Sequence, residues 1–397
     1  MAFQLVEPRV ETFYCFDDLI RFANEEAIRT IRLPLKGLLE QGAVVADDQG
    51  IGTGQTLYSL NTDSFKALCH LTGTTPDFLQ GLQVEGLASA VLNDVLASGR
   101  VRRDIDALEV VCDEENLQVV GFVSNRYCGY SNKTFLSDIM RCIDPVVTDK
   151  ALFPILGQFT FKEGHSINTR MYLRLTSTKI CGAVRGRGGN GEDRSEIGLQ
   201  AFNSMAGGQA VRFSYFLHRL ICANGLTAQV AGGAGRVTHT GTSEFFNSKL
   251  KAAADEVLKG MGAAARMIQT LGDLTFDSRK LARYLDHKEL FSILPGRDLK
   301  EFCKRGIPKD VFQEIEDPKA REEARYALMI DKIPECIGDS EALAVFRSYF
   351  RENASMWDFI NLFTAHAKTL PLADKLRTEE RAGNLADWIA KNRRKFA

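Results

Sequence analysis

Hydrophobic and polar residues alternate from Val211 to His218, and this period of two predicts a β-strand. Successive strand residues point to opposite faces, so the apolar positions beginning at Val211 share one face, and Arg212, Ser214, Phe216 and His218 share the other. We expect the first face to build core. The second presents a cation, a hydroxyl, an aromatic ring and an imidazole, which suits a phosphate-and-base surface better than an ordinary solvated face.

A second strand repeats this pattern between Ile167 and Thr176. Its polar face carries Arg170, Tyr172 and Arg174, which are two cations around an aromatic ring. Proteins that bind single strands without sequence preference hold the backbone with cations and stack the bases on aromatic rings. The alternative interpretation is a solvated sheet face with cross-strand pairing.

Two hairpins are expected in the middle of the chain. One joins Leu108–Cys112 to Leu117–Val123, and the other joins Ile155–Lys162 to Ile167–Thr176 through Glu163–Ser166. Together with the strand at Val211 they predict an α+β fold, in which a central antiparallel-rich sheet is flanked by an N-terminal helical region and a C-terminal helical region.

Helical periodicity predicts the two flanking regions. The chain thus divides into a mainly helical region 1–104, a β-rich basic domain 105–235 and a helical region 236–397. The expected short helices are Asp17–Ala27, Asp63–Leu71, Pro76–Leu82, Leu87–Ala97, Asn132–Arg141, Asp277–Leu285, Pro318–Ile330, Ser340–Phe350 and Met356–Lys368.

A longer apolar stripe runs through a helix expected at Ser243–Leu271 and includes Leu250, Val257, Met261 and Ile268. Such a stripe usually packs on its own domain, and a contact between subunits is the alternative. Because it continues over about six helical turns, we expect these four residues to form the interface of a homo-oligomer.

Charge is uneven along the chain although the formal net charge is only −1. Between Thr160 and Thr240 there are ten Lys or Arg against four Asp or Glu, a local net charge of +6. Nine cysteines occur without a C-x-x-C pair, which argues against a disulfide framework and a zinc ribbon. No segment approaches the roughly 18 apolar residues of a membrane span, so we expect a cytoplasmic protein with no membrane contact. We also expect no cofactor.

Further cations lie around these strands. Arg185 and Arg187 alternate with glycines in a tract that can close around an anion or form a plain hairpin tip. Arg219 ends the strand that begins at Val211. Arg126 and Tyr127 close another strand, where Arg126 can bind phosphate and Tyr127 can stack a base; the alternative is that Arg126 braces the sheet.

Three separated motifs resemble a known family: FVSNRYCGYSN at Phe122–Asn132, NSMAGGQAVRFSYFLHRLICANGL from Asn203, and RVTHTG at Arg236–Gly241. Together with shorter matches across nearly the whole chain, they resemble the phage/plasmid-like family, a numbered domain of unknown function. The resemblance implies a gene of phages, plasmids or integrative elements, and it implies no established activity.

DNA binding in mobile-element replication or recombination is therefore the expected function, most concretely single-strand DNA binding or annealing. An anti-defence protein that binds a host protein is the first alternative, with other mobile-element proteins as further partners. An enzyme using Cys222 and His218 is the second, although strand residues four apart lie about 13 Å apart, too far for direct activation. The residues expected to bind nucleic acid are Arg126, Tyr127, Arg170, Tyr172, Arg174, Arg185, Arg187, Arg212, Phe216, His218 and Arg219.

Overall fold

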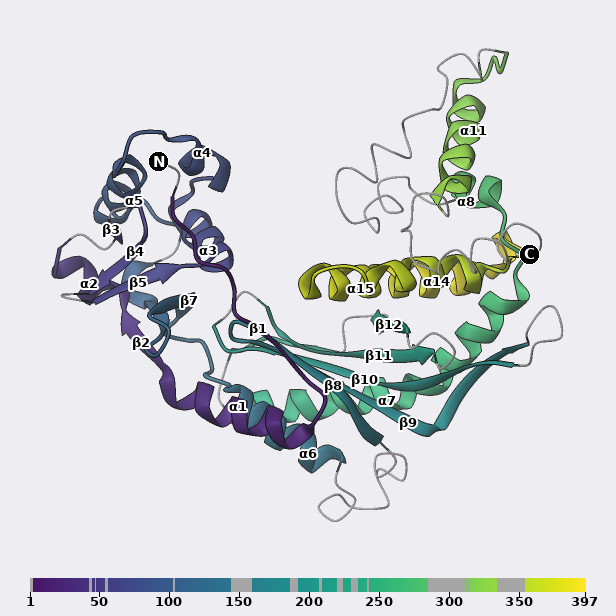
Figure 1. Ribbon diagram of the computed structural model, residues 1–397, viewed down its shortest axis with the longest axis horizontal. Helices are drawn as coiled ribbons and strands as arrows, with labels where there is room; N and C mark the ends of the chain where they lie inside the picture. Colours follow the sequence, from purple (N-terminus) through teal and green to yellow (C-terminus); the bar gives the residue numbers. More distant parts are fainter. Residues whose placement is uncertain are drawn as a thin grey trace.

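The computed structural model describes residues 3–42, 45–46, 48–53, 56–102, 104–143, 159–185, 192–206, 209–219, 224–229, 235–240, 243–284, 312, 314–333 and 354–397. Two sheets and the helices packed on them form an α+β fold, which confirms the predicted class (Figure 1).

The larger sheet occupies the middle of the molecule, and all its strand pairs are antiparallel. Five of its strands follow each other in space as they do along the chain, which is the arrangement of consecutive hairpins. The sheet comprises β1 (Val10–Phe13), β8 (Phe159–Ile167), β9 (Arg170–Arg185), β10 (Glu192–Ser204), β11 (Val211–Arg219) and β12 (Asn224–Gln229) in that order, with β13 (Arg236–Val237) paired to β11.

A second sheet lies in the N-terminal unit, formed by residues 30–124, most of which the sequence predicted to be mainly helical. The predicted helices are present as α3 (Thr62–Thr72), α4 (Pro76–Gly81) and α5 (Leu87–Ala97). The sheet has the order β2 (Thr30–Pro34), β6 (Leu108–Asp113), β7 (Gln118–Ser124), β5 (Thr56–Leu60), β4 (Gly50–Thr53) and β3 (Val45–Ala46), and α2 (Leu35–Glu40) and the short turn η1 (Ile105–Ala107) lie beside it. The predicted hairpin of β6 and β7 is confirmed, and it pairs with strands from before residue 104.

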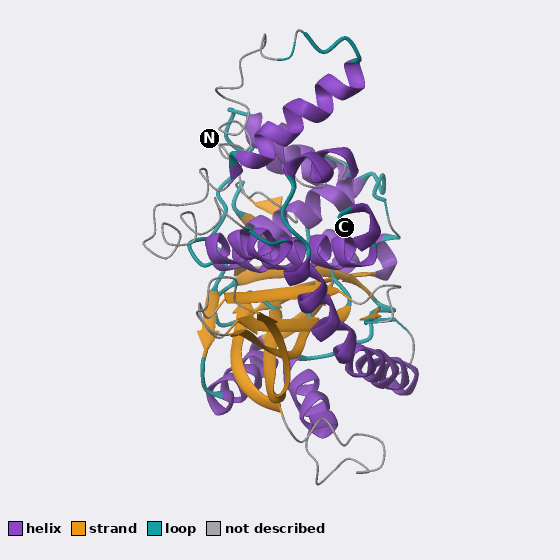
Figure 2. Ribbon diagram, turned by 90° about the vertical axis from the view of Figure 1, so that its right-hand side faces the viewer, coloured by secondary structure: helices purple, strands orange, loops and turns teal. Residues whose placement is uncertain are grey.

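Helices cover both faces of the larger sheet (Figures 1 and 2). The apolar face, with Leu173, Leu199 and Phe213, packs on α1 (Phe16–Arg29), α6 (Asn132–Ile143) and α7 (Ser243–Asp273). The polar face is crossed by α15 (Leu372–Lys391), which lies beside α14 (Met356–Ala367). The remaining elements are α8 (Ser278–Tyr284), α11 (Pro318–Asp331) and η3 (Arg393–Lys395), whereas the helix predicted at Ser340–Phe350 falls outside the described residues.

Two of the four stripe residues of α7 pack inside this chain, which corrects the expected subunit interface for these two. Leu250 belongs to the core under the apolar face of the sheet, and Ile268 belongs to the core formed with α14 and α15. Both side chains are buried. The side chains of Val257 and Met261 lie outside the described residues. Because α7 contacts β9, β10 and β11, it needs a long apolar face to cover several strands.

The hairpin of β8 and β9 turns later than the sequence predicted. Glu163–Ser166 continue the strand, and Asn168 instead forms the turn with a φ of 54°. Asn adopts this left-handed conformation more readily than most residues, and its side chain accepts a hydrogen bond from Arg9 N at 3.0 Å. The later turn places Arg170 at the very start of β9, beside the N-terminal unit.

Candidate nucleic-acid interface

One row of side chains crosses four neighbouring strands on the polar face of the larger sheet. Phe202 on β10 is directly opposite both Tyr172 on β9 and Arg212 on β11, and Arg212 is opposite Arg236 on β13. Residues directly opposite in a ladder share a face, so the register aligns two aromatic rings and two cations. The strands bring together Tyr172 and Arg212, which the sequence analysis selected from separate strands.

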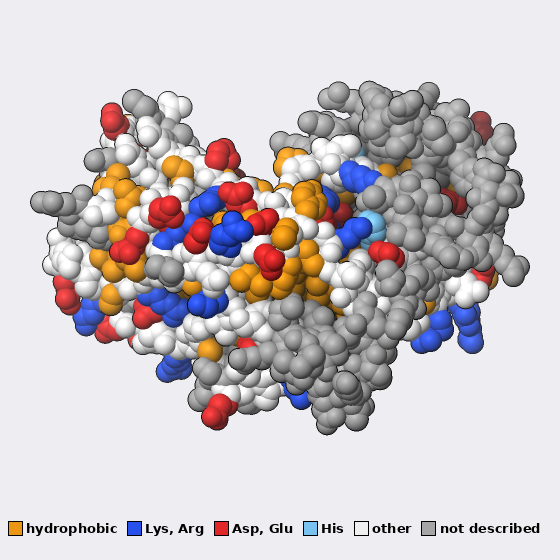
Figure 3. All heavy atoms as spheres, turned by 60° about the horizontal axis from the view of Figure 1, so that its bottom comes forward, with side chains coloured by type: hydrophobic (Ala, Val, Ile, Leu, Met, Phe, Trp, Pro, Cys, Tyr) orange, Lys and Arg blue, Asp and Glu red, His pale blue; other side chains and the backbone are white. Residues whose placement is uncertain are grey.

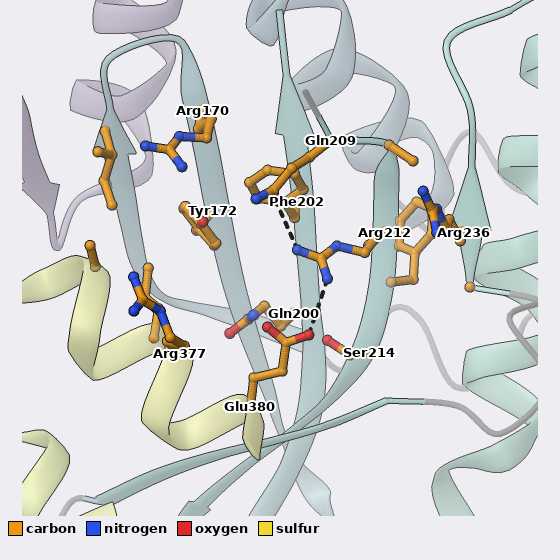
Figure 4. Close-up of a pocket in the computed structure, with 16 residues that line it drawn as sticks. Arg170, Tyr172, Gln200, Phe202, Gln209, Arg212, Ser214, Arg236, Arg377 and Glu380 are labelled. Carbon is orange, nitrogen blue, oxygen red and sulfur yellow. Dashed lines mark hydrogen bonds and ion pairs between the residues drawn. The ribbon is translucent and has the colours of Figure 1, made fainter. Parts of the chain in front are cut away.

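This row lines a pocket of about 500 Å³ between the sheet and the first turns of α15. Figure 4 shows Arg170 and Arg377 near Tyr172, and Arg212 and Arg236 beyond Phe202. We call this pocket the arginine pocket. It is lined by Ile167, Arg170, Tyr172, Gln200, Phe202, Gln209, Ala210, Arg212, Phe213, Ser214, Gly235, Arg236, Ala373, Leu376, Arg377 and Glu380. Its four arginines are accompanied by one carboxylate.

The centre of the pocket is ordered by contacts of Arg212. Its guanidinium donates to Glu380 at 3.0 Å and to the side-chain oxygen of Gln209 at 2.9 Å, and it lies 5.2 Å from the ring centroid of Phe202. The Tyr172 and Phe202 ring centroids are 4.6 Å apart. Phe202 is buried and forms the floor, whereas Tyr172 is half-buried and remains accessible from the pocket.

Arg170 marks the side of the pocket that faces the N-terminal unit. It forms an ion pair with Asp63, which lies in the first turn of α3. About a fifth of the Arg170 side chain is exposed, at 22%, and the Asp63 side chain is 44% exposed. Arg236 and Arg377 are exposed, so all four arginines of the pocket are in contact with solvent.

Arg174 is buried, which corrects its assignment to a phosphate-binding surface. The side chain has no exposed area and lies under α15, where it forms ion pairs with Glu163, at 2.6 Å, and with Glu379. It also donates to Gln200 at 2.7 Å. These partners engage all three nitrogens of the guanidinium and replace water that it loses on burial. Arg174 therefore ties α15 to the sheet.

Phe216 and His218 lie beside Arg174 in a cavity of only about 50 Å³, and their assignments are corrected for the same reason. Phe216 is 1% exposed and has the Arg174 guanidinium 4.5 Å from its ring centroid, so the ring is not available to a base. His218 is buried 3.6 Å from Glu196, and burial lowers its pKa below the ordinary value.

The pKa values of the two acids that contact Arg174 are shifted in opposite directions. Burial alone raises the pKa of Glu163, but the hydrogen bond with His165 and the charges of Arg174 and Lys375 outweigh it and hold the pKa below its ordinary value. The pKa of Glu379 is raised, because burial outweighs the attraction of Arg174. The cluster is a structural junction between α15 and the sheet. The alternation of β9 and β11 predicted a binding surface here because it does not show that α15 covers these residues.

Tyr127 braces the junction between the two sheets. Its hydroxyl donates to the carbonyl oxygen of Ser204 at 2.5 Å, and its ring stacks on His239 at 4.8 Å. Burial lowers the pKa of His239 to about 4, so this imidazole is neutral at physiological pH. These contacts engage the hydroxyl and the ring of Tyr127 within the protein, which disfavours its predicted stacking on a base. Arg126 is exposed on the same turn, away from the arginine pocket.

The recognised motifs meet at this junction. Asn132 donates to Glu26 at 2.7 Å, and Asn203 donates to the Asn132 side-chain oxygen at 2.8 Å. Glu26 and both asparagines are buried. The motifs around Asn132 and Asn203 thus supply contacts that hold α1 and α6 on the larger sheet, and the contacts of Tyr127 with Ser204 and His239 join the two sheets.

Some of the residues that the sequence selected as candidates for function fall outside the described part of the chain. Arg187 and Cys222 lie outside the described residues, as do the side chains of Arg185 and Arg219. Arg185 ends β9 and is paired in register with Glu192 of β10. The glycine tract at 231–234 is likewise outside the described ranges.

Three further residues of the pocket were missed by the sequence analysis: Phe202, Arg236 and Arg377. The signal for Phe202 lay in the register of β10 against β9 and β11, which alternation within one strand does not provide. Arg377 lies on α15, a helix that was not predicted.

Charges are mixed elsewhere. The face shown in Figure 3 carries Lys and Arg interspersed with Asp and Glu, without an extended area of one sign among its described residues. In the described part of the chain no group of three or more His, Cys, Asp or Glu is placed to hold a metal ion. No described helix is long and apolar enough to cross a membrane.

Comparison with models of protein families places part of the chain. Residues 144–290 match the model of a family described as a domain of unknown function, DUF932. This range holds the strands β8 to β13 and α7, and hence the row of Tyr172, Phe202, Arg212 and Arg236. No curated protein and no solved structure matches the chain.

Proposed function

We propose that the protein binds single-stranded nucleic acid in the arginine pocket. The observation that carries this proposal is the row of Tyr172, Phe202, Arg212 and Arg236 on the pocket floor. A volume of about 500 Å³ falls in the ordinary range of ligand sites, roughly 300–1,000 Å³. Guanidinium groups bind phosphate through paired hydrogen bonds, and an accessible ring beside them stacks a base.

The carboxylates in and beside the pocket are compatible with an anionic ligand. The Arg212–Glu380 pair keeps 32% and 29% of its two side chains exposed, and such partly solvated pairs contribute only about 0–1 kcal/mol. A phosphate that makes charge-assisted hydrogen bonds to the same guanidinium therefore displaces the carboxylate at small cost. In the absence of ligand, Glu380 holds Arg212 in position over Phe202.

The motifs support a proposal for the biological setting. Their resemblance to the phage/plasmid-like family supports a role in DNA replication or recombination of a mobile element, within the cytoplasm. Annealing of complementary strands is the most concrete activity, because a pocket that holds backbone phosphates and stacks bases without reading their edges accepts any sequence.

Fluorescence anisotropy with a labelled oligothymidylate tests the proposal. We expect wild-type binding that weakens steeply between about 50 and 200 mM salt, because phosphate contacts release counterions. Arg212→Ala and Arg236→Ala should each reduce the slope of log K against log salt by about 0.7. Tyr172→Ala should cost about 1–3 kcal/mol and leave the slope unchanged.

Arg21→Ala is the matched control, because Arg21 lies on α1 with 71% of its side chain exposed and outside the pocket. It should bind like wild type. Absence of binding at about 50 mM salt, by wild-type protein whose circular dichroism is native, would show that the proposed function is wrong.

A further inference from the structure

A second pocket, of about 440 Å³, continues from the arginine pocket toward the N-terminal unit. The two pockets share Arg170 and Gln209 in their linings, so they meet at these side chains. We call the second one the α3 pocket, because Asp63, Ala67 and His70 of α3 form one of its walls. Its other wall comes from β6 and β7 and from the turns that follow β8 and β10.

The chemistry of the α3 pocket differs from that of the arginine pocket. Ala67, Leu71 and Phe122 give it apolar surface, and Arg170 is the one Lys or Arg among its described lining residues. Such a surface suits the base and sugar of a nucleotide, whereas phosphates are better held where several arginines converge. A phosphate linking two nucleotides would lie against the shared Arg170.

The Asp63 carboxylate occupies this position through its ion pair with Arg170. The pair joins the two units of the molecule across the passage between the pockets, because Asp63 belongs to α3 and Arg170 begins β9. Both side chains keep contact with solvent, so the pair separates at small cost. Asp63 and a backbone phosphate therefore compete for the same guanidinium.

We propose that the two pockets form one groove for consecutive nucleotides of a single strand, in which Asp63 acts as an anionic gate on Arg170. This inference rests on the proposed function and extends it, because it makes the N-terminal unit part of the binding site. A strand enters the α3 pocket only when its phosphate replaces the Asp63 carboxylate.

Two substitutions in α3 test the groove in the full-length protein, with labelled oligothymidylate as the probe. Asp63→Asn removes the competing charge and should tighten binding by about threefold to fivefold at low salt, which corresponds to a partly exposed ion pair. Ala67→Glu places a carboxylate inside the α3 pocket and should weaken binding by about tenfold through repulsion of the strand. Ala67→Gln is its matched control, since it has a similar shape without the charge, and should bind better than Ala67→Glu.

The outcomes separate the two proposals. If wild-type protein binds and Tyr172→Ala weakens binding, while Asp63→Asn and Ala67→Glu both bind as wild type does, the groove is refuted and the arginine pocket stands. If folded wild-type protein does not bind at all, both proposals fall together. Equal weakening by Ala67→Glu and Ala67→Gln also overturns the groove, because a loss independent of charge reports altered packing rather than repulsion of a phosphate.

Discussion

Replacement of Glu26 by Gln should stabilise the protein at alkaline pH. Glu26 lies on α1 with only 1% of its surface exposed, and its carboxylate accepts a hydrogen bond from Asn132 at 2.7 Å. Burial raises its pKa from 4.5 to about 7, against the opposing effects of Asn132 and Arg29. The folded state therefore binds a proton more tightly than the unfolded state does.

The sign of the pH dependence follows from this raised pKa. The favourable contribution of protonated Glu26 is fully present below pH 4.5, the value of the unfolded chain, and is lost as pH rises through about 7. One pKa unit corresponds to about 1.4 kcal/mol, so the shift is worth about 3 kcal/mol at pH 8. Glu26→Gln keeps an acceptor oxygen for Asn132 and does not ionise.

Urea denaturation at two pH values measures the effect. Glu26→Gln should raise the free energy of unfolding relative to wild type by up to about 3 kcal/mol at pH 8, and by much less near pH 5. Glu25→Gln, at the exposed neighbouring position on the same helix, is the control and should show little dependence on pH. An equal difference from wild type at both pH values would refute the reasoning.

Two further predictions concern the junctions of the fold. Gly121→Ala should lower the free energy of unfolding by about 1–3 kcal/mol in urea melts, because the added methyl group would lie 2.4 Å from the carbonyl oxygen of Ala206. The control is Gly37→Ala in α2, where a methyl group meets nothing within 4 Å, so this substitution should be neutral or stabilising, and equal effects of the two substitutions would contradict the steric argument. Arg174→Met should cost about 3–5 kcal/mol because it leaves the acids beneath α15 without their cation, and adding Glu379→Gln should recover part of the loss; no recovery would mean that the pair does not couple α15 to the sheet.

Local periodicity was sufficient for most helices and for the faces of single strands. The helix predicted at Leu87–Ala97 is observed with the same bounds as α5, because its apolar spacing is set by one buried face. Alternation also placed Arg170, Tyr172 and Arg174 correctly on one face of β9. It did not separate the buried Arg174 from the accessible Arg170, because the period of a strand says nothing about what covers it.

The covering element is α15, and its sequence conceals it. Its buried face includes Thr378, Glu379 and Gly383 between apolar residues, so the stripe that reveals a helix is interrupted by polar and small side chains. Glu379 is tolerated there because Arg174 from a strand 205 residues away neutralises it. Such a pair is visible only in three dimensions, and for the same reason Phe202 and Arg377 were not assigned to the site.

Photocrosslinking tests the central claim most directly. An oligothymidylate carrying 4-thiothymidine should, on irradiation, attach to the folded protein at low salt, and mass spectrometry should locate the attachment on the peptides of β9 and β10 that contain Tyr172 and Phe202. Tyr172→Ala should reduce the yield, and Arg21→Ala should not. Attachment confined to peptides that line neither the arginine pocket nor the α3 pocket would contradict the account.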